Sequence, residues 1–319
     1  METPNGAALA PSSAAQGTFY AGRVLFVNGR PVTAARFAPS PRYTQLVPAR
    51  VKSKNYEYIF NDYGTYADIF NYPKSTAMIG QINGAGGQGC TNVLYGYGKN
   101  VFWNVPETNG IVVEYQVPQK VLKTLHLDYT STSSCAMSDS GDLAVGVLYG
   151  NSQGPGGQVI VFKKASGSGK VYRTPLSHEY FDGYDPKGDL FADGLLANFA
   201  FALVELPNGS SKFVTVKTSN APQSPGSVQW DGTYLDVFDQ GTNEVYRYTV
   251  SGRNARLNNT IRLSGVGDCA QTWLVPGLLY CADAGNFDGE VFKFPAGGSP
   301  IATFTGNFDL PLGVTAARK

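Results

Sequence analysis

Residues 135–162, CAMSDSGDLAVGVLYGNSQGPGGQVIVF, contain the pattern that decides the fold. A first β-rich segment leads into a turn at Gly141, the strand DLAVG follows, and after a glycine-rich loop a third strand ends at Phe162. The turn signal recurs at intervals of 43, 47, 44 and 45 residues, at Gly98, Gly141, Gly188, Gly232 and Gly277. A period of this length indicates an array of structural repeats, each built from several strands.

A second, independent signal gives the phase of the repeat. An aromatic or large apolar residue closes each third strand, at intervals of 43, 47, 44, 42 and 46 residues, at Tyr72, Tyr115, Phe162, Leu206, Tyr248 and Phe294. Six units are visible, and each has the signals of an inner strand, two middle strands and a weaker outer strand. We therefore predict an all-β fold, a six-bladed β-propeller of four-stranded antiparallel blades.

The last unit is cut short in a way that predicts circular closure. The first visible blade, Tyr56 to Ile82, has a poor match to an inner strand ahead of it, while the chain ends in FDLPLGVTAARK, which resembles the start of a further blade. We expect Gly313 to Lys319 to pair with the first blade, because closure removes free sheet edges. The alternative is that QLVPARVKSK, residues 45–54, supplies that inner strand.

Residues 1–45 differ from the repeats and are expected to form a leader, with the propeller at 46–319. The first residues, METPNGAALAPSSAAQG, are low in complexity and typical of a disordered tether or export remnant. GRVLFVNGRPVTAARF follows, in which Asn28-Gly29 between two apolar arms predicts a β-hairpin. This hairpin either packs on the propeller or pairs with a neighbouring molecule, which would give self-association through residues 18–37.

The four cysteines suggest two disulfides. Cys90 and Cys135 are one repeat apart and are expected on neighbouring inner strands, while Cys269 and Cys281 flank a turn near Val275. Each pair can come within bridging distance, although four buried thiols are the alternative and the connectivity stays open. Two bridges with no cysteine left over favour an oxidising compartment.

Several phrases resemble a known group of proteins. YIFNDYGTYADIFNYPK, GYDPKGDLFADG and SPGSVQWDGTYLDVFDQ are similar to the bacterial exported propellers related to the NHL and YVTN repeat families, and to an uncharacterised subgroup of them. The likeness covers most of residues 56–319. It implies a secreted or cell-envelope protein, mature after removal of its leader, and it says little about function because propellers host many activities.

Composition excludes some partners. The formal net charge is +1 and no long basic run occurs, so nucleic acid is not expected as a partner. No stretch reaches the roughly 18 consecutive apolar residues that a membrane helix requires, so no transmembrane segment is predicted.

Propellers commonly bind ligands at one mouth of the central channel. We expect the mouth where inner strands begin, and where second and third strands are joined, to carry the site. The candidate ligand-binding residues there are Asp62, Tyr63, Asn104, Asp182, Tyr184, Asp239, Asp268 and Asp283. Their oxygens suit Ca²⁺, but Asp and Asn also recur in tight turns because they hydrogen-bond their own backbone, so no metal or cofactor is predicted. Trp103 is expected beside this mouth, where aromatic side chains can serve as platforms for sugar stacking, although the packing of the blades also uses aromatic residues.

Catalytic signals are weak. Lactonase propellers similar to gluconolactonase place a Glu, an Asn and an Asp on a central Ca²⁺, and no Glu is expected at the start of an inner strand here. Lyases of the streptogramin type depend on histidine, and of the two present, His178 has Glu179 and Asp182 nearby in sequence as potential partners. Nucleophile-elbow, phosphate-loop and zinc-protease motifs are absent, so the sequence leans against an enzyme without deciding the question.

These observations favour a secreted, non-catalytic propeller that binds a small molecule, a glycan or a protein surface at the channel mouth. The first alternative is a metal-dependent hydrolase, lactonase or lyase working at the same face. The second is a structural or assembly protein that uses the N-terminal hairpin to pair with a neighbouring protomer.

Overall fold

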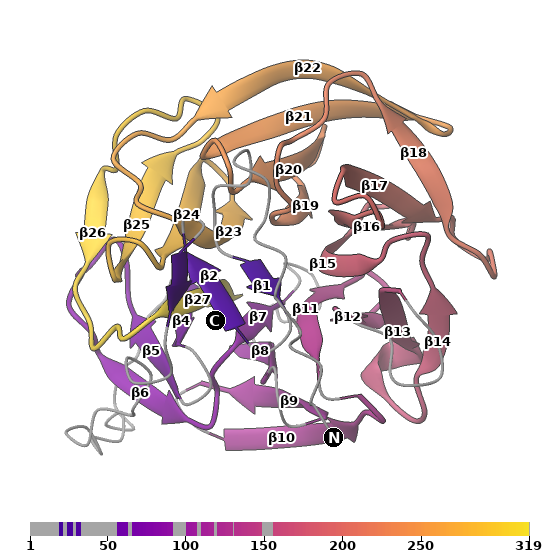
Figure 1. Ribbon diagram of the computed structural model, residues 1–319. Helices are drawn as coiled ribbons and strands as arrows, with labels where there is room; N and C mark the ends of the chain where they lie inside the picture. Colours follow the sequence, from indigo (N-terminus) through magenta and orange to yellow (C-terminus); the bar gives the residue numbers. More distant parts are fainter. Residues whose placement is uncertain are drawn as a thin grey trace, which may run out of the picture.

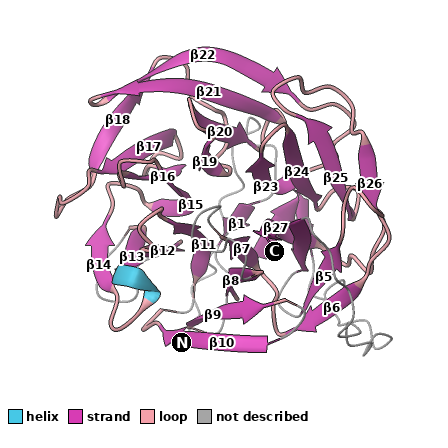
Figure 2. Cartoon of the chain, turned by 180° about the vertical axis from the view of Figure 1, so that it is seen from behind, coloured by secondary structure: helices cyan, strands magenta, loops and turns pink. Residues whose placement is uncertain are grey.

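The fold was described from a computed structural model. It gives the backbone of residues 19–21, 24–27, 30–32, 56–62 and 318, and backbone and side chains of 66–91, 100–106, 110–117, 120–129, 131–148 and 156–317. In these residues the regular structure consists of β-strands and one short 3-10 turn, η2 (Lys163–Ala165). Figure 1 shows the sheets arranged radially around a central axis, and Figure 2 shows the same ring from behind. This is the arrangement of a β-propeller, as the repeat predicts.

Two four-stranded antiparallel sheets come from residues 88–173. The first contains, from the axis outward, β7 (Gln88–Cys90), β8 (Val101–Val105), β9 (Ile111–Gln116) and β10 (Lys120–His126). The second contains β11 (Thr132–Met137), β12 (Leu143–Val147), β13 (Gln158–Phe162) and β14 (Lys170–Arg173).

An eight-stranded sheet follows, made of two antiparallel sets of four. One set is β15 (His178–Tyr184), β16 (Leu190–Leu195), β17 (Phe201–Leu206) and β18 (Val214–Thr218). The other is β19 (Val228–Trp230), β20 (Leu235–Asp239), β21 (Glu244–Ser251) and β22 (Asn254–Arg262). The two sets join at their outer strands, where β18 runs parallel to β22 with Lys217 opposite Asn254 and Thr218 opposite Ala255.

The last sheets bring the two ends of the propeller region together. One contains β23 (Cys269–Val275), β24 (Leu278–Asp283), β25 (Asp288–Lys293) and β26 (Ala302–Phe304). The other contains β27 (Pro311–Arg318), β4 (Tyr56–Asp62), β5 (Tyr66–Phe70) and β6 (Gly80–Asn83). β27 pairs antiparallel with β4, from Pro311 opposite Asp62 to Arg318 opposite Tyr56.

A separate three-stranded sheet precedes these strands. It contains β1 (Phe19–Ala21), β2 (Val24–Val27) and β3 (Arg30–Val32). β2 and β3 are antiparallel, with Val27 opposite Arg30. Asn28 and Gly29, which the sequence assigns to a hairpin turn, lie outside the described residues.

The repeating glycines lie in the turns between first and second strands. Gly141 and Gly188 have φ values of 87° and 82°, and their N–H groups donate to Ser138 O and Asp185 O. This left-handed conformation costs glycine little and other residues much more, which explains why the turn signal recurs. Gly98 lies outside the described residues.

Side chains connect neighbouring inner strands around the axis. Gln229 Oε1 on β19 accepts the N–H of Leu274 on β23 at 2.7 Å. Gln271 on β23 accepts the N–H of Val314 on β27 at 2.8 Å and donates to Gly89 O on β7 at 3.2 Å. These bonds satisfy buried backbone groups that no adjacent strand ladder reaches.

Two disulfides lie within the sheets. Cys90–Cys135 joins the inner strands β7 and β11, with a Cα–Cα distance of 5.7 Å, and Cys269–Cys281 joins β23 and β24 at 5.6 Å. The pairings that the cysteine spacings suggest are therefore confirmed. Trp103 packs beside the first bridge and is fully buried, so it serves the packing of the blades and not sugar stacking at the mouth. The side chain is part of the core between two neighbouring sheets.

We expect the two bridges to stabilise the fold unequally. They close segments separated by 45 and 12 residues, and a longer closed loop removes more entropy from the unfolded chain. Replacing both Cys90 and Cys135 by Ala should cost about 4 kcal/mol, and replacing both Cys269 and Cys281 about 3 kcal/mol.

Urea unfolding of the two double variants and the oxidised parent measures this difference. The parent after reduction, with its thiols blocked under denaturing conditions before refolding, serves as the control without both bridges. An unchanged unfolding midpoint in the Cys90/Cys135 variant would contradict the expected stabilisation.

Candidate functional site

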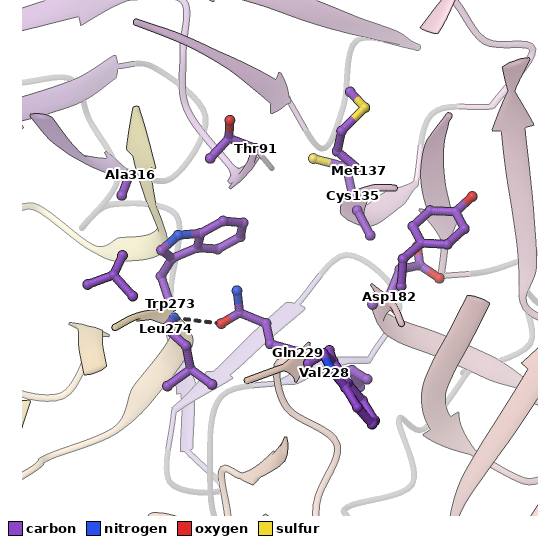
Figure 3. Close-up of a pocket in the computed structure, with 14 residues that line it drawn as sticks. Thr91, Cys135, Met137, Asp182, Val228, Gln229, Trp273, Leu274 and Ala316 are labelled. Carbon is purple, nitrogen blue, oxygen red and sulfur yellow. Dashed lines mark hydrogen bonds between the residues drawn. The ribbon is translucent and has the colours of Figure 1, made fainter. Parts of the chain in front are cut away.

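A cavity of about 120 Å³ lies in the central channel. It is lined by the C-terminal parts of the inner strands, and Figure 3 shows side chains from several of them converging on it. The side chains most relevant to binding are Met137, Asp182, Tyr184, Gln229, Trp230 and Trp273. The channel is therefore hollow where the inner strands end.

A larger cleft of about 480 Å³ adjoins this cavity. The turns that follow the inner strands form its rim and contribute Asp139, Asp185 and Asp231, while Arg247 lies on β21 and Phe294 directly follows β25. Tyr184, Trp230, Leu274 and Val275 line both spaces. A ligand can thus extend from the channel into the cleft, whose size is typical of small-molecule sites.

The predicted face and the face that holds the cavities are different. Asp182 and Tyr184 line the channel cavity because β15 begins at His178, which places both near the end of that inner strand and not at its start. The other described candidates lie at the opposite end of the sheets, at the ends of second strands or just before an inner strand: Asp62, Asn104, Asp239, Asp268 and Asp283. Tyr63 lies outside the described residues, and only the backbone of Asp62 is described.

The carboxylates on that opposite face hold the backbone in place. Asp239 accepts the N–H groups of Gln223 and Ser224, ahead of β19. Asp283 accepts those of Gly267 and Asp268, ahead of β23, at 2.7 Å each. The role of these residues in ligand binding stays a prediction; their described contacts are structural.

A β-bulge brings two buried carboxyl groups together on β15. Glu179 lies opposite Gly194 and Asp182 opposite Ala192, and the register shifts between Glu179 and Phe181. The extra residue puts Glu179 and Asp182 on the same face, although a separation of three would place them on opposite faces of a regular strand. Burial, and the charge of Asp182, raise the pKa of Glu179 well above its usual range.

Two serines of the neighbouring strand β11 donate hydrogen bonds to this pair of carboxyl groups. Ser133 Oγ donates to Glu179 Oε2, and Ser134 Oγ donates to Asp182 Oδ2 at 3.0 Å. Glu179 Oε1 and Asp182 Oδ1 have no hydrogen-bond partner among the described residues. Burial raises the pKa of Asp182 to about 7, against the lowering effect of Ser134.

The structure does not assemble His178 with these carboxyl groups. His178 precedes Glu179 in a regular part of β15, so the two side chains project from opposite faces. His178 Nδ1 lies 2.9 Å from Ser177 Oγ, and its ring stacks on Phe199 with centroids 6.0 Å apart. Burial lowers the pKa of His178. The expectation that no Glu begins an inner strand is wrong, because Glu179 is the second residue of β15.

Gln229 presents an amide donor to the channel cavity. Its Oε1 accepts the N–H of Leu274, which fixes the orientation of the amide and leaves Nε2 turned towards the space beside Trp273 (Figure 3). Trp273 itself packs against the core clusters on both sides of the channel. The cavity therefore combines aromatic surface with one fixed donor and the Asp182 carboxyl group.

Arg247 is already neutralised within the cleft. Its guanidinium pairs with Asp231 and, through Nε at 3.1 Å, with Asp236. The same group lies over the rings of Tyr234 and Phe294, at 4.5 and 5.1 Å from their centroids. One positive charge shared by two carboxylates leaves the rim without an excess of positive charge.

One described cluster has carboxylate oxygens close enough to share a metal ion: Asp283, Asp288 and Glu290, within 4.8 Å of one another. Asp283 contributes poorly, because its two oxygens already accept the four backbone N–H groups of Gly267, Asp268, Gly285 and Asn286, together with the amide of Asn286. Ca²⁺ takes roughly six to eight oxygens, and this set does not fit that demand. We assign no metal to it.

The aromatic and charged residues that line most of the two cavities were not identified from the sequence. Trp230 and Trp273 are the chief examples, and Arg247 and the rim carboxylates are others. A signal was present, because both tryptophans stand shortly before the repeating glycines, in VQWDG and QTWLVPG. Those positions are the ends of inner strands.

Comparison with known proteins supports the fold. No family model matches the chain, and no curated protein sequence matches it. A chain in a crystal structure of a nidogen/laminin complex has a TM-score of 0.65 and 12% identity, over 82% of this chain and 98% of that chain. A protein of unknown function from Bacteroides caccae has a TM-score of 0.61 and 11% identity, over 84% and 100%.

A third similar structure is a catalytically inactive virginiamycin B lyase from Staphylococcus aureus with quinupristin. It has a TM-score of 0.51 and 13% identity, over 77% of this chain and 84% of that chain. At these identities the likeness extends to the fold, a β-propeller, and not to activity. None of the described residues forms a helix with the length and hydropathy needed to cross a bilayer.

The buried carboxyl group of Glu290 should make stability depend on pH. Burial, with Asp283 and Asp288, raises its pKa to about 8. The unfolded chain loses this proton near its usual pKa of 4.5, whereas the folded chain keeps it until about pH 8. The free energy of unfolding should therefore fall across this interval as the pH rises.

Glu290→Gln should flatten that dependence and raise stability most at alkaline pH. Urea unfolding at about pH 5 and about pH 9 measures the change. Glu244→Gln, at a partly exposed position on β21, is the matched control and should leave the pH dependence in place. Equal slopes in the parent and Glu290→Gln would show that Glu290 ionises normally in the fold.

Proposed function

We propose that this protein is a non-catalytic β-propeller that binds a small molecule or a glycan residue in the channel cavity and the adjoining cleft. The observation that supports this most directly is the continuity of the two spaces, through the shared lining residues Tyr184, Trp230, Leu274 and Val275. Aromatic surface beside a few fixed polar groups is typical of ligand pockets. The absence of an assembled His178, Glu179 and Asp182 set favours binding over catalysis.

We further infer that the propeller has six blades and belongs to the NHL and YVTN-like group. The four separate four-stranded sheets, together with the two sets of four in the eight-stranded sheet, support this count. The pairing of β27 with β4 supports closure of the ring by the C-terminal strand. The propeller then spans residues 46–319, and residues 1–45 form the leader.

We infer that the protein works in an oxidising compartment, outside the cell or in its envelope. The two disulfides support this, because such bonds persist mainly where thiols are not kept reduced. The nidogen/laminin complex is an assembly of proteins, and a protein surface is therefore kept as a further class of ligand. The volume of the channel cavity, about 120 Å³, favours a small ligand or the end of a glycan chain.

Intrinsic fluorescence offers a direct test of ligand binding. The chain has three tryptophans, of which Trp103 is fully buried in the core while Trp230 and Trp273 line the cavities. A ligand in this site should change the emission of Trp230 and Trp273 and raise the unfolding temperature. We expect hits from a library of small polar molecules and monosaccharides to show both effects.

Trp230→Ala should abolish the fluorescence change and the thermal shift for each such hit. Trp103→Phe is the matched control, since it removes a tryptophan that contacts neither cavity and should leave binding intact. Its folding is checked first by unfolding temperature, because the side chain is in the core. Hits whose binding survives Trp230→Ala would place the ligand elsewhere and contradict the proposed site.

A further inference from the structure

The described residues that line the two cavities include more carboxyl groups than cationic side chains. Among the described residues that line the channel cavity, Asp182 carries a carboxyl group and none is Lys or Arg. The described lining of the cleft adds Asp139, Asp185 and Asp231 against one cation, Arg247, which pairs with Asp231 and with Asp236. A cleft lined by one sign of charge concentrates ligands of the opposite sign.

One carboxyl oxygen of Asp182 has no hydrogen-bond partner among the described residues. Its side chain is 6% exposed, and Oδ1 accepts no hydrogen bond among the described residues. Behind it lie Glu179 and Asp193, both buried, and the charge of Asp182 helps to raise the pKa of each. Buried carboxyl groups without a cation are costly, so a positive group beside Asp182 would be strongly favoured.

The rest of the lining is aromatic and apolar. Trp273 extends into the channel cavity (Figure 3), Trp230 and Tyr184 line the cavity and the cleft together, and Met137 covers another side. Aromatic faces attract cations through their quadrupoles, and this effect grows when the cation is desolvated. The same lining is poor in oxygen ligands, so it suits an organic cation far better than a metal ion.

We propose that the ligand is an organic cation whose compact ammonium group occupies the channel cavity beside Asp182 and Trp273, with the remainder of the molecule in the cleft. This inference rests on the proposed ligand-binding function and names its ligand class. The cavity volume of about 120 Å³ is somewhat smaller than the roughly 150 Å³ of an engineered apolar pocket that holds benzene. A methylated ammonium head group is of suitable size.

The sharpest test compares two probes that differ in charge alone. Choline carries a trimethylammonium group, and 3,3-dimethylbutan-1-ol replaces its nitrogen by carbon with nearly the same shape. Calorimetric titration and tryptophan fluorescence of the full chain should show binding of choline, with the neutral analogue at least about tenfold weaker, corresponding to a cation–π and charge contribution of ordinary size.

Asp182→Asn should reduce choline affinity by about tenfold, because it removes the charge and keeps an oxygen for Ser134. Trp273→Phe should also weaken choline binding, since a smaller ring gives a weaker cation–π contact. Glu244→Gln, on β21 and absent from the lining of both cavities, is the charge-matched control and should bind choline like the parent. Unfolding temperatures verify that each variant is folded.

The outcomes separate this inference from the proposed function. Equal binding of the two probes, or choline affinity unchanged in Asp182→Asn, would overturn the cationic ligand class and leave a binding site for neutral molecules. Stabilisation by Ca²⁺ alone that Asp182→Asn removes would also overturn it, in favour of a metal ion. If neither probe binds, the inference fails; the proposed function fails as well only if the monosaccharide and small-molecule library gives no signal dependent on Trp230.

Discussion

The structure depends on the lateral linkage of the inner strands around the axis. Within a sheet the strands hold one another through their backbone ladders, but neighbouring inner strands have no such ladder between them. Side chains supply the links. The Cys90–Cys135 bridge joins β7 to β11, serines of β11 bond carboxyl groups of β15, and Asp193 accepts the N–H groups of Phe181 and Gly226 between β15 and β19. Ser227 and Gln229 accept backbone N–H groups of β23. Gln271 links β23 to β27 and β7, and Gln88 links β7 to β27.

This linkage also explains where the cavities lie. At the level of Gln271 and Gln88, side chains cross between neighbouring inner strands. Towards the ends of the inner strands, Trp230, Trp273 and Tyr184 line the channel cavity. Gln229 serves both purposes, since one end of its amide links β19 to β23 and the other faces the cavity. The proposed binding surface and the linkage of the ring therefore share the side chain of Gln229.

The periodic part of the structure could be predicted from the sequence, and the local irregularities could not. Gly141 and Gly188 recur because their turns require a left-handed backbone. The closing aromatic or apolar residues recur in the C-terminal half of the third strands or just beyond it. The predicted pairing of Cys90 with Cys135 follows from that period, and the pairing of Cys269 with Cys281 follows from the turn that they flank. The start of β15 at His178 and its bulge near Glu179 leave no periodic signal. The misplacement of Asp182 and Tyr184 at the start of their inner strand has this origin, because a shift of a few residues moves both from one mouth of the channel to the other.

The buried carboxyl groups are the part of the molecule that stability alone does not explain. Asp239 and Asp283 stabilise the fold by accepting backbone N–H groups. Replacing them by apolar residues would leave those donors without partners. Glu179 and Asp182 differ, because each has one oxygen without a partner among the described residues, and the charge of Asp182 raises the cost of ionising Glu179. A fold selected for stability alone would gain from a smaller number of such groups. Of the two, Asp182 lines the channel cavity next to aromatic side chains, where a bound cation would offset the cost of its buried charge.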